Sequence, residues 1–261
     1  AATLSVGNSL QLTASVAHAN ATINTLISDS ATTEIATVDG NGKVNALKQG
    51  STIITVKSTD GSNISAQCKL TVVTLVEGIS INITNATLAE GESLQLEATV
   101  SPEFATNKSV EWSSSNETVA TVSEEGIVTA ISKGTAILTA KSTDGSNISA
   151  SCTVTVVKLV TAIYINKTMV GMKIGEQTTI TAYAIPTDAT NTHLRWYSED
   201  ESIATVDNGV VTAVGIGSTY ICVESTDGSN IVEKCEIEVG DPSGIGSISS
   251  EAVSVYAANG T

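Results

Sequence analysis

The chain repeats itself three times, and this repetition constrains its fold more than any other feature of the sequence. The nine residues STDGSNISA at 58–66 return unchanged at 142–150, and STDGSNIVE stands at 225–233. A second motif, IATV or VATV, begins at Ile35, Val119 and Ile203, with a spacing of 84 residues each time. Self-similarity at a fixed period marks tandem structural units. We therefore expect three copies of one unit.

The unit itself has the pattern of an all-β domain. Apolar residues alternate with polar ones, as at Leu94, Leu96 and Ala98, and no window keeps a helical period. This period of two is typical of half-buried strands. Turn sequences rich in Gly, Asn and Asp separate the short segments. About seven strands in such a unit predict a sandwich of two sheets.

A series of motifs in the second unit gives a more specific indication. They are GESLQL at 91–96, WSSS at 112–115, VATV at 119–122, GIVTA at 126–130 and CTVTV at 152–156. In this order they resemble the bacterial immunoglobulin-like domain of group 2. The third unit keeps the pattern with Trp196 and Pro186, whereas the first lacks the Trp and the Pro and has Ile27 near the Trp position. The resemblance implies three tandem immunoglobulin-like β-sandwiches.

The repeat also sets the expected domain boundaries. We place immunoglobulin-like domains at 1–74, 75–158 and 159–240, with the opening strand of the first one missing from the sequence. Residues 241–261 are interpreted as a linker and the truncated start of a C-terminal module. The short linkers lack Gly, Ser and Pro, so we expect the domains to pack end to end in an elongated rod, about 100 to 120 Å long.

Composition excludes several classes of function. The chain has 27 acidic against 12 basic residues, a net charge of −15, and Arg195 as its single arginine. Such a chain repels nucleic acid and anionic lipid. No run approaches the roughly 18 to 20 apolar residues that span a bilayer. The two histidines, His18 and His193, lie near no nucleophile or metal-ligand pattern, so we expect no enzyme, catalytic residue, cofactor or metal site.

One candidate ligand-binding patch is confined to the third unit. By alternation, Arg195 and Tyr197 point outward on the strand that carries Trp196, and Tyr220 points outward on a strand expected to be its neighbour. Arg and Tyr are enriched at binding hot spots. The alternative is ordinary cross-strand packing of half-exposed rings.

The cysteines leave one pairing open. Cys68, Cys152 and Cys235 occupy one repeated position and are interpreted as buried thiols. Cys222 is the extra cysteine, on the strand before Cys235. Alternation points Cys222 outward and Cys235 inward, which argues against a disulfide, although a bulge would permit one.

Two further motifs have a structural and a functional interpretation. Trp112 and Trp196 recur at one position and are expected in the core rather than on a sugar-binding face. The Asp-Gly-Ser-Asn segments are expected to form hairpin turns, because they offer too few carboxylates for calcium. A calcium ion, if bound, would lie between domains, with ligands such as Glu77, Glu124 or Glu125.

These observations favour a non-enzymatic segment of an exported bacterial cell-surface protein. The resemblance implies cell adhesion, as in adhesins of the intimin and invasin kind, or a stalk that presents another module. The alternative is a carbohydrate-binding accessory domain of a surface glycan-handling protein. We expect an extracellular or cell-surface location and a monomer. The expected partner is a host or cell-surface protein or glycan, with no nucleic acid and no membrane insertion.

Overall fold

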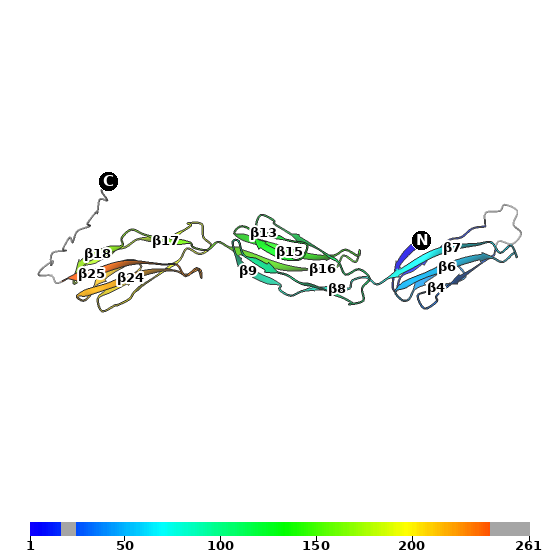
Figure 1. Cartoon of the computed structure of the whole chain (residues 1–261), viewed down its shortest axis with the longest axis horizontal. Coiled ribbons are helices and arrows are strands. Elements are labelled where there is room, and N and C mark those ends of the chain that lie inside the picture. The colour runs from blue at the N-terminus through cyan, green and yellow to red at the C-terminus, as the bar shows by residue number, and fades with distance from the viewer. Residues whose placement is uncertain (17–24, 241–261) are drawn as a thin grey trace, which may run out of the picture. The chain divides into compact units, whose positions relative to one another are not determined.

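The computed structural model describes residues 1–16 and 25–240 and is built of strands (Figure 1). The described residues form 25 strands and no helix, which confirms the predicted all-β class. The chain divides into two compact units, Ala1–Val156 with the first two repeats and Val157–Thr261 with the third. The segment predicted to begin a C-terminal module, 241–261, lies outside the described residues.

The first repeat forms two sheets that enclose a small core. Its four-stranded sheet has the order β1-β7-β6-β3, with β1 parallel to β7, and its three-stranded sheet has the order β2-β5-β4. Its strands are β1 (Ala2–Ser5), β2 (Ser9–Gln11), β3 (Leu26–Ser30), β4 (Ala36–Val38), β5 (Lys43–Ala46), β6 (Gly50–Ser58) and β7 (Ser65–Val73).

The second repeat adds a two-stranded ribbon to this plan. Its sheets have the orders β12-β15-β16-β9 and β10-β14-β13, and β11 pairs antiparallel with β8 in the ribbon. Its strands are β8 (Gly78–Ile81), β9 (Asn85–Ala89), β10 (Ser93–Gln95), β11 (Ala98–Ser101), β12 (Val110–Ser114), β13 (Ala120–Val122), β14 (Ile127–Ala130), β15 (Gly134–Ser142) and β16 (Ser149–Val157).

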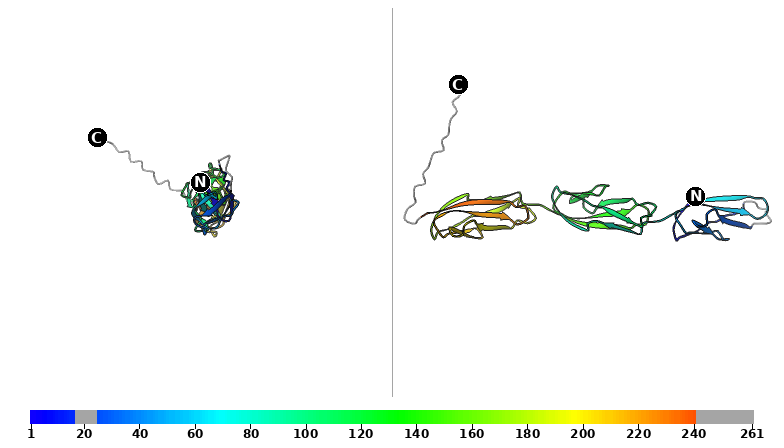
Figure 2. Two further views of the ribbon diagram at one scale, coloured as in Figure 1. Left: turned by 90° about the vertical axis from the view of Figure 1, so that its right-hand side faces the viewer. Right: turned by 60° about the horizontal axis from the view of Figure 1, so that its bottom comes forward.

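The third repeat has the same topology as the second. Its sheets are β18-β25-β24-β21, β19-β23-β22 and the ribbon β17-β20. Figure 2 gives two further views of the ribbon diagram. Its strands are β17 (Ala162–Ile165), β18 (Met169–Lys173), β19 (Gln177–Thr179), β20 (Ala182–Ile185), β21 (Leu194–Ser198), β22 (Ala204–Asp207), β23 (Val210–Ala213), β24 (Gly217–Ser225) and β25 (Val232–Gly240).

The strand number of the second and third repeats differs from the expected seven. Each has nine strands, because the first two edge segments are broken in the middle and serve two sheets. At the break in the second repeat, the Asn82 amide donates to the Glu97 carbonyl, and the Glu97 amide donates to Asn82 Oδ1 at 2.9 Å. This side-chain bond takes the place of a regular strand pair.

Each repeat has its own apolar core. Every cluster of buried side chains is drawn from a single repeat: residues 36–72 in the first, 88–156 in the second, and two clusters at 160–239 in the third. Small and branched residues on alternate strand positions fill these cores, as the period of two predicts. The described part of the chain holds no helix long and apolar enough to cross a membrane.

Candidate functional site

The predicted patch lies on the outer face of the four-stranded sheet of the third repeat. Strand β21 pairs antiparallel with β24, and Tyr197 stands directly opposite Cys222 in this pairing. The alternating neighbours Ile221 and Val223 are buried in the core, so Tyr220 and Cys222 point to the other face. The structure therefore brings Arg195, Tyr197 and Tyr220 onto one face, although binding by this patch stays a prediction.

Arg195 is held by a carboxylate and by an aromatic ring. Its guanidinium forms an ion pair with Glu224, which lies opposite it on β24. The guanidinium carbon also lies 5.2 Å from the centre of the Tyr197 ring, within the range of a cation–π contact. The hydrogen bond and charge of Glu224 raise the pKa of Arg195. One face of Tyr197 is thus covered by a cation.

A second cation covers the other tyrosine. Lys234 on β25 lies 5.6 Å from the centre of the Tyr220 ring and forms an ion pair with Glu199. The Lys234 ammonium lowers the pKa of the Glu199 carboxyl, and Glu199 raises the pKa of Lys234. The patch is a cross-strand network of two tyrosine rings and two ion pairs. A ligand would therefore meet cations and carboxylates rather than bare aromatic faces.

Sequence alternation alone can predict more of this network. Because Cys235 points into the core, its neighbours Lys234 and Glu236 must point outward on β25. Alternation on β21 and β24 alone does not reveal Lys234 or its partner Glu199. The signal for Lys234 is the alternation of inward and outward side chains on β25, which the buried Cys235 fixes.

The cysteines of the third repeat lie on opposite faces of one sheet. Cys222 stands opposite Lys234, and Cys235 stands opposite Ile221. All four cysteines of the chain are free thiols, in agreement with the alternation that argued against a disulfide. Cys222 is fully buried although it points outward, and its thiol donates to Glu199 Oε1 at 3.7 Å. Burial raises the pKa of both thiols.

The Asp-Gly-Ser-Asn segments form the predicted turns and also have a second role. In each turn the glycine and the asparagine adopt positive φ, as at Gly145 (89°) and Asn147 (62°). The Asp144 carboxylate accepts from the Ser146 amide at 2.9 Å and from the Val76 amide at 2.6 Å. In the third repeat, Asp227 accepts from the Val160 amide at 2.5 Å. The turn thus fixes the chain segment that enters its own repeat.

Nothing in the described residues assembles a metal site at these turns. Within 1–16 and 25–240, no three His, Cys, Asp or Glu side chains group so that they could hold a metal ion. The oxygens of Asp144 are instead used by backbone and serine donors. Burial raises the pKa of Asp144, but the hydrogen bonds from Ser146 and Val76 outweigh it and leave this pKa below its usual value.

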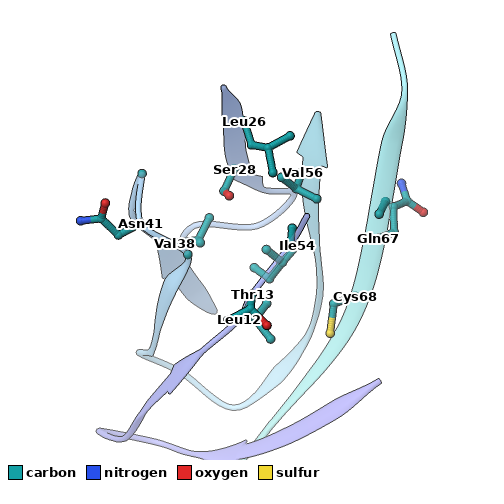
Figure 3. A pocket seen from close by; sticks show the side chains of 14 residues that line it. Leu12, Thr13, Leu26, Ser28, Val38, Asn41, Ile54, Val56, Gln67 and Cys68 are labelled. Atoms are coloured by element: carbon teal, nitrogen blue, oxygen red, sulfur yellow. The ribbon is translucent and has the colours of Figure 1, made fainter. Parts of the chain in front are cut away.

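The first repeat contains a cavity where the other repeats carry a tryptophan. Ser28 stands opposite Val56, as Trp112 stands opposite Ala140 and Trp196 opposite Val223. Ile27, which the sequence places near the Trp position, lies one residue before it and points outward with 58% of its surface exposed. The cavity measures about 420 Å³ and includes Leu12, Val38, Ile54 and Cys68 in its lining (Figure 3).

The two tryptophans pack against the cores of their repeats, as predicted. Trp112 is half-buried against the second core, and Trp196 is half-buried against both clusters of the third. Trp196 also lines an open groove at the surface of its repeat. The core interpretation is therefore correct, while part of the Trp196 ring remains accessible.

The paired sheets, the repeated core Trp and the three copies define a class: tandem immunoglobulin-like β-sandwiches of the bacterial type. The chain belongs to the bacterial Ig-like domain family, group 2. The sequence profile of this family matches residues 1–70, 75–154 and 159–235, which confirms the resemblance found in the sequence.

Similar proteins contain this region as a small part of a longer chain. An uncharacterised protein of Clostridium acetobutylicum is 33% identical over 63% of this chain and 17% of its own length. Ice-binding protein 1 of Shewanella frigidimarina is 32% identical over 86% of this chain and 26% of its own. A 3-O-alpha-D-galactosyl-alpha-L-arabinofuranosidase of Bifidobacterium longum subsp. longum is 42% identical over 38% and 8%. The chain thus spans about a quarter or less of these relatives.

Proposed function

We propose that this chain is a non-enzymatic segment of an exported bacterial surface protein, in which the repeats contribute to cell adhesion or present another module. The family carries this proposal, because three of its domains account for nearly all described residues. The acidic surface, with a net charge of −15, suits exposure to solvent outside the cell. The domain boundaries at 74/75 and 158/159 belong to the same proposal.

The Arg195 patch is the proposed contact surface for an adhesion partner. It joins Arg195, Tyr197 and Tyr220 with Lys234, so that the cations of an acidic chain gather around two rings. Carboxylates or sulfates of a partner would replace Glu224 and Glu199 as the groups that pair with Arg195 and Lys234. In the second repeat, Glu111, Ser113 and Ile137 take the places of Arg195, Tyr197 and Tyr220, so this surface is special to the third.

An array of host matrix proteins and glycans tests this surface. We would probe it with the intact chain and with a Tyr197→Ala, Tyr220→Ala variant whose circular dichroism is unchanged. The matched control is Ser113→Ala, Ile137→Ala, at the corresponding positions of the second repeat. Binding lost only with the tyrosines supports the patch as the contact surface. Binding that all three proteins share would place the adhesive site elsewhere, and no binding by the intact chain would leave only the presenting role.

A carbohydrate-binding accessory function is the second candidate. Similar proteins also include a kappa-carrageenase of Pseudoalteromonas carrageenovora and a lacto-N-biosidase of Bifidobacterium bifidum. This chain covers 18% and 6% of their lengths. In this second candidate function, the repeats would hold a polymer near an enzyme domain elsewhere in the same protein. The same array discriminates the two candidates, because an accessory domain binds glycans and ignores matrix proteins.

A further inference from the structure

An open groove lies between β20 and β21 of the third repeat, where its lining residues Leu194 and Trp196 alternate along β21 with Arg195 and Tyr197 of the other candidate surface. It measures about 420 Å³. Tyr183 on β20 and Trp196 on β21 line it, together with His193 and the hydroxyl-bearing Thr187 and Thr192. No Asp, Glu, Lys or Arg is among its lining residues, although the chain as a whole is strongly acidic.

Tyr183, at the edge of the groove, belongs to a stacked pair of tyrosines on the outer face of the ribbon. Tyr164 and Tyr183 stand directly opposite each other in the ribbon β17-β20, with ring centres 4.7 Å apart and planes inclined by 24°. Their neighbours Ile163 and Ala184 are buried, so both rings face outward, with 45% and 50% of their surfaces exposed. A ring already ordered by stacking loses little entropy when a ligand binds to it.

The opposite wall is also fixed before any ligand arrives. The His193 amide donates to Asn191 Oδ1 at 3.0 Å, and the Thr226 hydroxyl donates to the His193 carbonyl at 2.9 Å. The Asn191 amide group in turn donates to Thr226 Oγ1 at 3.1 Å. These bonds hold the backbone on either side of the imidazole, while the His193 side chain stays exposed.

The second repeat has the same frame without the same lining. There Asn107, Ser109 and Thr143 make the corresponding hydrogen bonds. The register of the ribbon places Ser80 opposite Thr99 where the third repeat has its stacked tyrosines. At the positions of Thr187, Thr192 and His193 the second repeat has Glu103, Lys108 and Ser109, while Trp112 corresponds to Trp196. Because the fold forms with these residues, the aromatic and uncharged lining of the third repeat is not required for folding.

We propose that this groove binds a neutral oligosaccharide. Sugar rings present apolar C–H faces, which fit the exposed tyrosine pair beside the groove and, within it, the accessible part of Trp196. Their hydroxyl groups can donate to and accept from Thr187, Thr192 and His193. The absence of charged lining residues disfavours sulfated and carboxylated sugars, which the Arg195 patch would suit better. The inference gives the carbohydrate candidate a site, and it does not depend on adhesion through Arg195.

Chemical-shift mapping on the intact 26.6 kDa chain tests the proposal. The probes are neutral hexasaccharides of glucose, galactose, mannose, xylose, arabinose and N-acetylglucosamine, with sialyllactose as a charged comparison. We expect saturable shifts of residues 182–196 with at least one neutral probe and weaker shifts with sialyllactose. The Tyr164→Ser, Tyr183→Thr variant, which adopts the residues of the second repeat, should bind about tenfold more weakly.

The matched control is the Tyr197→Ala, Tyr220→Ala variant, which alters the other candidate surface and should keep full affinity. Unchanged far-ultraviolet circular dichroism confirms that both variants are folded. The proposal is overturned if none of the neutral probes gives saturable shifts. It is also overturned if the Tyr164→Ser, Tyr183→Thr variant binds as tightly as the parent. Affinity lost only in the control would instead assign sugar binding to the Arg195 patch.

Discussion

Ser28 shows how one residue changes the packing of a sheet in which the pairing of its own strand is kept. In the second and third repeats an indole ring fills the space that Ser28 leaves as a cavity lined by residues such as Val38 and Ile54. Side chains that line an open pocket of this kind pack against fewer protein atoms than those around a filled space. Ser28 thus weakens the packing of the core but leaves the pairing of its strand unchanged.

We expect Ser28→Trp to stabilise the first repeat by about 1 kcal/mol, because burial of the ring exceeds the strain of fitting it. Chemical denaturation followed by tryptophan fluorescence measures the change. Cys68, which lines the cavity, should then react more slowly with a thiol reagent. The matched control, Trp112→Ala, opens the same space in the second repeat and should cost about 3 to 5 kcal/mol. Lower stability of the Ser28→Trp variant would show that the cavity cannot hold the ring.

Asp144 gives a residue-scale prediction that depends on pH. Its folded pKa lies below the usual value because hydrogen bonds from Ser146 and Val76 outweigh burial. A carboxyl with a lowered folded pKa contributes stability above its unfolded pKa of about 3.9 and loses it as pH falls through the folded pKa. We expect Asp144→Asn to lower the stability of the second repeat by about 1 kcal/mol at pH 7. The difference from the parent should shrink below pH 4, and a constant difference down to pH 2 would contradict the role of the charge.

Element boundaries were harder to predict than strand faces. Alternation correctly placed Arg195, Tyr197 and Tyr220 outward, because a period of two needs no knowledge of partners. It could not show that Lys234 covers Tyr220, since that contact comes from a third strand. The nine strands of the second repeat exceed the expected seven because two edge segments are broken where Asn82 bonds to Glu97, and this side-chain bond has no apolar signature.

The turn between β22 and β23 gives a prediction at the scale of an element. Gly209 has φ of 87°, and a Cβ there would overlap the Ile180 carbonyl oxygen and lie 3.3 Å from Trp196 Cζ2. We expect Gly209→Ala to cost about 3 kcal/mol, since it adds backbone strain to a steric clash. Gly228 is the matched control, with φ of 90° and no atom within 4 Å of a Cβ. Gly228→Ala should cost only about 1 kcal/mol of left-handed strain.

Urea unfolding of both glycine variants, followed by Trp196 fluorescence in a Trp112→Phe background, measures these two costs. The ratio of the two losses in unfolding free energy is more informative than either loss, because the two glycines have nearly the same φ. Equal losses for the two variants would mean that the contact with Ile180 relaxes without cost. In that case the turn would not hold the ring of Trp196 in place.

At the scale of the whole molecule, the repeats differ in how much core each one has. Among the described residues, the main cluster of the first repeat has six buried members, against eleven in the second. The third repeat has two clusters, of nine and five. Since each cluster belongs to one repeat, their stabilities should be separable. The sequence predicted three copies of a unit, but unequal packing follows from contacts that no periodicity reveals.

We therefore expect the first repeat to unfold at the lowest denaturant concentration. The sequence gives this event an unusual signature, because residues 1–74 contain no Trp, Tyr or Phe. Circular dichroism should lose part of its amplitude before the fluorescence of Trp112 and Trp196 changes. In the Ser28→Trp variant, the early transition should become visible by fluorescence and move to higher denaturant. Coincident curves by both probes in the parent chain would mean that the first repeat unfolds together with its neighbours, and that core size does not set the order.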